Sequence, residues 1–209
     1  MTAMKHASTR WRCGIIAAAA VLFCLDCPQA QAHLVTTGLG PVYDGIAHLA
    51  LSPGDLAVVV VLVLLAAMRG ARQGRWLLAL LPAAWLVGGL GGLTFPITAN
   101  LGWATGLSFL LAGALVAADL NLPLLVVASL AVFIGGFHGV GTGAALAQAS
   151  SGGLELAGEL VALIVVMTLV AGLVVSLKAF WMRIVVRVLG SWIAATGLLM
   201  IGWSLRAGR

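Results

Sequence analysis

Two polar residues near the start of the chain have the types and the spacing of a metal-binding pair. Asp44 and His48 lie four residues apart in the segment Pro-Val-Tyr-Asp-Gly-Ile-Ala-His-Leu, which covers residues 41–49. If the segment is helical, both side chains project from one face and can reach the same ion. An Asp–His ion pair, or a cap at a turn, would explain the same spacing. The sequence leaves both interpretations open.

A histidine and a glutamate farther along the chain could complete such a site. His138 lies in a glycine-rich stretch, Gly-Gly-Phe-His-Gly-Val-Gly, which clears room around its ring. Glu159 follows Glu155 by four residues at the start of a long apolar segment, so both project on one side of a helix. Structural alternatives exist: His138 could bond a neighbouring carbonyl, and acidic residues in a first turn are favoured by the helix dipole. We interpret Asp55 in the same way as these acidic residues, as one that the helix dipole favours in a first turn.

The start of the chain has the organisation of a secretory signal peptide. Residues 1–12 are basic, residues 13–25 are apolar, and Ala30-Gln-Ala32 fits a signal-peptidase site. The alternative is an uncleaved signal anchor. Cleavage after Ala32 makes His33 the first mature residue, whose amine and imidazole would form a chelating pair for nickel or copper. Chance placement of the cleavage site explains His33 equally well.

The candidate ligands are all nitrogen and oxygen donors: His33, Asp44, His48, His138 and Glu159. Such donors suit Ni(II), Co(II), Zn(II) or Cu(II). The three cysteines all lie within the expected signal peptide, so a mature chain would have no thiol, which argues against Cu(I). Motifs of hydrolases, phosphate loops, zinc proteases and c-type haem attachment are missing from the sequence. We therefore predict that the protein is not an enzyme and holds no tightly bound cofactor.

The composition defines the environment in which these residues must work. Apolar residues make up 62% of the chain and charged residues 8%, with a mean hydropathy of +1.15. Soluble domains are about 45–50% apolar and about 25% charged. The composition therefore excludes a water-soluble enzyme and predicts an integral membrane protein with the lipid bilayer as its partner. The net charge of +5 comes from short basic runs between apolar stretches, so no nucleic-acid partner is expected.

The apolar stretches predict an all-α, polytopic membrane protein with a six-helix transmembrane bundle after the signal peptide (1–32). Residues 33–209 would form one domain, with a short interfacial or re-entrant segment at 33–52 on the outer side. The 27 glycines of the sequence favour closely packed helices rather than a wide pore. The expected spans cover about residues 53–68, 76–93, 97–118, 122–140, 154–177 and 184–205.

Charge and topology agree on the orientation of these spans. A secreted N-terminus places the turns at 69–75 and 178–187 inside, and each contains three basic residues, against two in the outer C-terminal tail. The candidate ligands then fall at or near the outer face, while Asp119 lies at the inner face. Polar groups within a membrane are costly, so their grouping on one side predicts a functional site there.

The sequence resembles the HupE/UreJ hydrogenase and urease accessory membrane proteins. The resemblance rests on a signal that ends in Ala32-His33, on the block Gly-Pro-x-x-Asp-Gly-x-x-His-Leu at 40–49, and on Phe137-His138-Gly139 late in the fourth span. It covers essentially the whole chain in length and six-span layout. Gly-Pro replaces the family's His-Pro, Asp44 and His48 are separated by three residues rather than adjacent, and a second histidine is missing after the later block. These departures are typical of a divergent branch.

Members of this family are regarded as nickel, sometimes cobalt, permeases that serve metalloenzyme maturation. The resemblance thus implies a divalent-metal permease in the bacterial inner membrane, with the mature N-terminus on the periplasmic side. It places the family's metal-binding motifs on Asp44, His48 and His138. The alternative is a non-transporting assembly factor or anchor for a partner membrane enzyme, in which the histidines are packing or docking residues.

Overall fold

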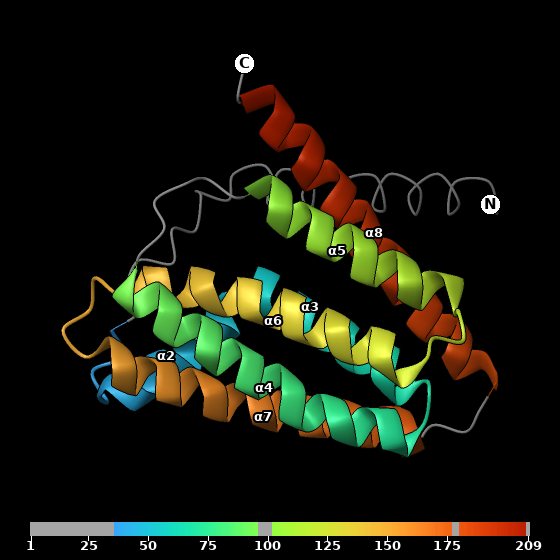
Figure 1. Ribbon diagram of the computed structural model, residues 1–209, viewed down its shortest axis with the longest axis horizontal. Helices are drawn as coiled ribbons and strands as arrows, with labels where there is room; N and C mark the ends of the chain where they lie inside the picture. Colours follow the sequence, from blue (N-terminus) through green and yellow to red (C-terminus); the bar gives the residue numbers. More distant parts are fainter. Residues whose placement is uncertain (1–35, 96–101, 177–179, 208–209) are drawn as a thin grey trace, which may run out of the picture. The chain divides into compact units, whose positions relative to one another are not determined.

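The computed structural model describes residues 36–95, 102–176 and 180–207, and every regular element in these ranges is an α-helix (Figure 1). This confirms the all-α prediction. A helix satisfies its backbone hydrogen bonds internally, as a chain in lipid requires. The expected signal peptide and His33 lie outside the described residues. The helices are α2 (Pro41–Leu51), α3 (Pro53–Ala67), α4 (Ala71–Thr94), α5 (Gly102–Ala118), α6 (Leu124–Leu146), α7 (Gly152–Ser176) and α8 (Phe180–Ala207).

Four of these helices are long and apolar enough to cross a membrane: α4, α6, α7 and α8. Helices α2 and α3 pass the same test together, but the chain bends by 74° between them, so the described residues provide up to five spans. Helix α5 has 17 residues, fewer than the roughly 20 that a bilayer core requires. Membrane character is therefore supported, and the full set of six spans stays a prediction.

The bend between α2 and α3 lies at Ser52 and Pro53. Ser52 is the N-cap residue of α3 and Pro53 its first helical residue, although the Ser52 side chain makes no capping hydrogen bond. Proline has no N–H to donate, so it suits the first turn of a new helix rather than the continuation of an old one. The predicted interfacial or re-entrant segment thus includes a helix of its own, α2.

Two predicted boundaries were wrong. The arginine-rich turn expected at 69–75 is confined to residues 68–70, and Arg72 and Arg75 already belong to α4. Helix α6 continues to Leu146, through glycines that were expected to form a loop from residue 141. Of those glycines, Gly143 faces α4, and close packing between helices stabilises a backbone that glycine alone would weaken.

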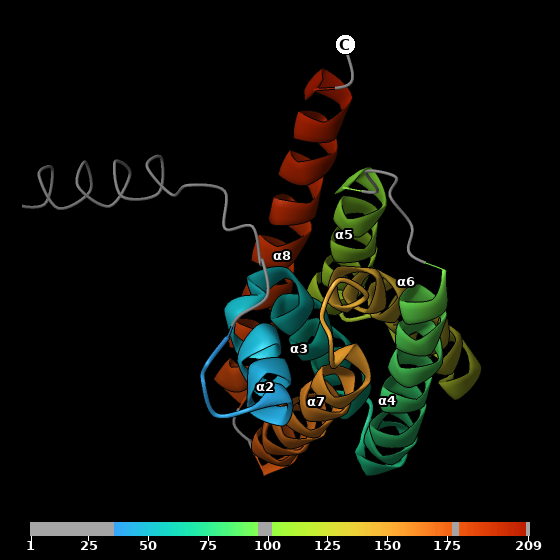
Figure 2. The same cartoon turned by 90° about the vertical axis from the view of Figure 1, so that its left-hand side faces the viewer.

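Glycines bring the helices together in three pairs, α4 with α6, α5 with α8 and α2 with α7, as Figures 1 and 2 show. At each contact a Cβ added to the glycine would meet backbone atoms of the facing helix. This confirms the predicted tight packing, in which small residues let helices approach closely. The glycines are Gly88, Gly92, Gly139 and Gly143 between α4 and α6; Gly106, Gly113, Gly190 and Gly197 between α5 and α8; and Gly45 and Gly158 between α2 and α7.

Helix α3 forms the centre of this arrangement. Nearly all of its side chains from Val58 to Ala67 are buried, and it contacts each of the other described helices. A helix that is apolar all round is stable only when it is surrounded. The other helices leave large apolar side chains exposed, such as Leu169 and Trp203, which is the expected surface toward lipid.

Candidate functional site

A buried histidine and a buried glutamate meet between α2 and α7. The Nδ1 atom of His48 lies 3.3 Å from Oε2 of Glu159, and the two side chains are 6% and 0% exposed. Neither of these atoms has a hydrogen-bond partner among the described residues. The two atoms thus approach each other as a buried ion pair, but neither has a well-aligned hydrogen bond, which is costly in a dry interior.

The packing of α2 on α7 positions this pair. Gly45 lies against the backbone carbonyl of Glu155, and Gly158 lies against the backbone carbonyl of Val42. His48 follows Gly45 by about one turn, and Glu159 follows Gly158 directly. Side chains at these positions would otherwise hold the helices apart, so the two glycines allow the imidazole to reach the carboxylate.

A second histidine–carboxylate pair lies between α6 and α3. Nδ1 of His138 is 2.8 Å from Oδ1 of Asp55, and its Nε2 is 3.0 Å from the Ser108 hydroxyl on α5. His138 is 5% exposed, and the rings of Trp85 and Phe109 stack with it. Both ring nitrogens are thus engaged. His138 differs in this respect from His48, whose Nδ1 atom has no hydrogen-bond partner among the described residues.

One turn of α6 connects the two pairs. Thr142 follows His138 by four residues, so both lie on the same face of the helix. The Thr142 hydroxyl donates a hydrogen bond of 3.2 Å to Oε1 of Glu159. Five helices therefore contribute to one buried polar region.

The candidate ligands predicted from the sequence are only partly brought together. His48 meets Glu159, whereas His138 pairs with Asp55 instead. Asp44 turns toward the preceding segment, where its Oδ1 accepts hydrogen bonds of 2.6 Å from both the backbone N–H and the hydroxyl of Thr37. Across residues 36–95, 102–176 and 180–207, no three His, Cys, Asp or Glu side chains form a group that could hold a metal ion.

Sequence reasoning missed three members of this region: Asp55, Ser108 and Thr142. Asp55 carried a signal, since it is an acidic residue in an apolar stretch, but its place in the first turn of α3 favoured a purely structural role. Serine and threonine are common in membrane helices, where they bond their own backbone. Nothing in the sequence distinguishes Ser108 or Thr142 from such residues.

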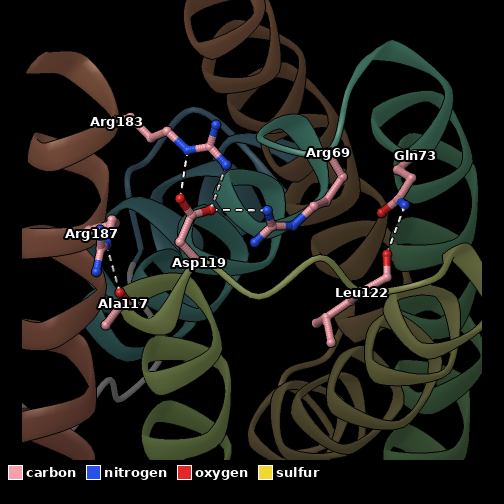
Figure 3. Close-up of polar contacts among 7 residues, drawn as sticks. All are labelled: Arg69, Gln73, Ala117, Asp119, Leu122, Arg183 and Arg187. Carbon is pink, nitrogen blue, oxygen red and sulfur yellow. Dashed lines mark hydrogen bonds and ion pairs between the residues drawn. The ribbon is translucent and has the colours of Figure 1, made fainter. Parts of the chain in front are cut away.

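The opposite ends of the helices carry a separate charged cluster, which Figure 3 shows. Asp119 accepts hydrogen bonds from Arg69 (3.0 Å) and from Arg183 (2.6 and 3.1 Å). These bonds, first of all those from Arg183, hold the pKa of Asp119 below its usual value. The cluster joins the α3–α4 turn, the α5–α6 turn and the start of α8 at one end. Asp55 and Arg69, at the two ends of α3, are about 21 Å apart along the helix.

Comparison with known families gave one result. A family model described as HupE / UreJ protein matches residues 19–200. Curated proteins and solved structures gave no match.

Proposed function

The chain belongs to the HupE/UreJ family, and from that premise we propose that it is a permease for a divalent transition-metal ion. Nickel is the proposed cargo, with cobalt as a second, and the imported ion would supply metalloenzyme maturation. The proposal places the protein in the inner membrane, with the histidine–carboxylate end of the helices on the outer side.

The observation that carries this proposal is the unsatisfied pair formed by His48 and Glu159. A cation between Nδ1 and Oε2 would satisfy both atoms and offset the cost of burying the carboxylate. Two ligands about 2.1 Å from one ion lie roughly 3.0 Å from each other at the right angle typical of nickel, and roughly 3.4 Å at a tetrahedral angle. The observed separation of 3.3 Å lies between these two values, so a small movement of either side chain would bring both atoms to one ion.

Two protein ligands suit a cargo better than a resident ion. A transported ion must be bound strongly enough to enter and weakly enough to leave. With His48 and Glu159 as ligands, water would complete the coordination shell. Asp44, which is partly exposed near the start of α2, is the proposed outer contact, together with His33.

His138 is the proposed next contact on the way inward. It lies one helical turn, about 6 Å, from Thr142 and closer to the Asp119 end of α6. Its nitrogens become available only when Asp55 and Ser108 release them. We therefore assign the first capture of the ion to His48 and Glu159, and its onward passage to His138 and Asp55.

The test is nickel binding to the purified protein, measured by calorimetry, together with uptake of radioactive nickel by cells that express it. Glu159→Gln keeps the shape of the side chain but removes the charge. We expect it to weaken nickel binding by more than the roughly hundredfold upper effect of an outer-shell change and to abolish uptake, and His48→Gln to do the same. Cobalt is measured in parallel.

Glu155→Gln is the matched control, because Glu155 lies one turn earlier on α7 and has a hydrogen bond from Ser151. It should retain most of the binding and the uptake. Wild-type binding and uptake in both Glu159→Gln and His48→Gln would refute the proposed site. A correctly folded wild-type protein that binds neither metal, yet co-purifies with a membrane enzyme, would instead establish the accessory role.

A further inference from the structure

The surface of α4 near its start has a basic hollow of about 550 Å³. Its lining residues are Arg72, Arg75, Trp76 and Ala79. They share one face of the helix, since their spacing is three, one and three residues. All four are exposed, and Trp76 is 52% exposed.

The two arginines of this hollow have no counter-charge within the described residues. Neither side chain takes part in an ion pair or a hydrogen bond there, and the first turn of α4 contains no acidic residue. Gln73 of α4 contacts the α5–α6 turn at Leu122, and the carboxylate of that turn, Asp119, is already bound by Arg69 and Arg183. Two guanidinium groups one turn apart repel each other, and an anion between them would remove that repulsion.

The position of the hollow indicates which anion fits. It lies at one end of a helix that is long and apolar enough to cross the membrane. Tryptophan is enriched at this level, where the headgroups of the bilayer begin. Guanidinium groups bind phosphate oxygens in a bidentate manner.

The same face of α4 continues beyond the hollow as an apolar surface. Ala83, Leu86, Val87 and Leu90 follow at helical spacing, and all four are exposed. Such a surface can accept an acyl chain whose headgroup occupies the hollow, whereas a free phosphate ion would leave it unused. We propose that Arg72, Arg75 and Trp76 bind the headgroup of an anionic phospholipid, with its acyl chain along α4. This site does not depend on metal transport.

The test is native mass spectrometry of the full-length protein in detergent, with phosphatidylglycerol or phosphatidylcholine added in equal amounts. Wild type should retain phosphatidylglycerol in preference to phosphatidylcholine. The double variant Arg72→Gln/Arg75→Gln should lose about thirtyfold in affinity for phosphatidylglycerol, the effect of two basic residues near a membrane surface. Arg206→Gln, which removes an exposed charge near the end of α8, should behave as wild type.

Three outcomes would overturn the proposal. Equal retention of phosphatidylglycerol by the double variant and by wild type would show that the hollow is not the site. Equal retention of the two lipids by wild type would show that the headgroup charge is not recognised. Displacement of phosphatidylglycerol by an equal concentration of inorganic phosphate would show that the site binds a free anion. Circular dichroism checks that both variants fold.

Discussion

The two carboxylate oxygens of Glu159 have different surroundings. Oε1 accepts a hydrogen bond from Thr142, whereas Oε2 approaches His48 without one. The Glu159 side chain has no exposed surface, so water cannot supply the missing hydrogen bond. Thr142 therefore fixes the carboxylate so that its free oxygen faces the imidazole, and it acts as a positioning residue for the proposed capture of the ion.

Replacing Thr142 by valine tests this role, because valine has nearly the same shape but cannot donate a hydrogen bond. We expect Thr142→Val to weaken nickel binding by about tenfold, as outer-shell changes commonly do. Calorimetry on the purified variant measures the effect. Thr142→Ser, which keeps the hydroxyl, should restore most of the affinity. Equal losses in both variants would point to packing rather than hydrogen bonding.

At the residue scale, the sequence predicted which residues belong to the candidate site better than it predicted which of them contact each other. His48 and Glu159 were singled out because polar residues in an apolar chain are costly, and the structure brings them together. Helical spacing suggested Asp44 as the partner of His48, but His48 faces α7 while Asp44 faces Thr37. Contacts between distant helices decide such pairings, and a single sequence does not contain them.

At the scale of elements, the spacing of glycines determines which helices pack together. Gly88 and Gly92 on α4, and Gly139 and Gly143 on α6, each repeat after four residues and so line one face of their helix. The sequence showed that small residues were abundant and predicted close packing. It did not show which glycines face another helix. Gly141, for example, lies in the same stretch of α6 but packs against nothing.

Gly139 and Gly141 provide a matched pair of substitutions on α6. A Cβ at residue 139 would fall on the backbone of Trp85, so Gly139→Ala must push α4 and α6 apart, at a cost of about 1–3 kcal/mol. Gly141→Ala meets open space and should be neutral, or more stable by up to about 1 kcal/mol through helix propensity. Unfolding in mixed detergent micelles, followed by circular dichroism, compares them. Equal stability of the two variants would contradict the packing account.

At the scale of the whole described unit, polar contacts connect the α5–α8 pair to the other helices at two places, in the first half of α5 and just after its end. Ser108 on α5 bonds His138 on α6, and Asp119, just after α5, bonds Arg69 beside α3. Within the pair, Arg187 on α8 donates to the backbone carbonyl of Ala117 on α5. Helices α5 and α8 pack mainly on each other, so the bonds of Ser108 and Asp119 help to fix how the pair sits on the rest. The sequence predicted that Asp119 and the arginines lie on the same side of the membrane, but not which arginines contact Asp119.

Asp119 provides a test of this connection through pH. Its pKa lies below the usual value because hydrogen bonds from Arg183, and then from Arg69, favour the charged form more than burial opposes it. A lowered pKa in the folded state stabilises the protein above the ordinary aspartate pKa of about 4, and this contribution is lost as pH falls through the folded-state pKa. Asp119→Asn should therefore be less stable than wild type at neutral pH. We expect a difference of about 1–2 kcal/mol, limited by the exposure of Arg183 to solvent.

The stability difference between wild type and Asp119→Asn should stay constant from neutral pH down to the ordinary aspartate pKa of about 4. It should then shrink as pH falls through the lower folded-state pKa, because wild type loses the same charge. Asparagine tolerates the left-handed backbone at this position (φ 54°), so the substitution tests the charge rather than the turn. Asn121→Ser in the same exposed turn is the control, and its stability relative to wild type should not depend on pH. A difference for Asp119→Asn that stays constant from neutral to acidic pH would mean that the arginines do not hold a charged Asp119. In that case apolar packing and the Ser108–His138 bond would hold the α5–α8 pair on the other helices.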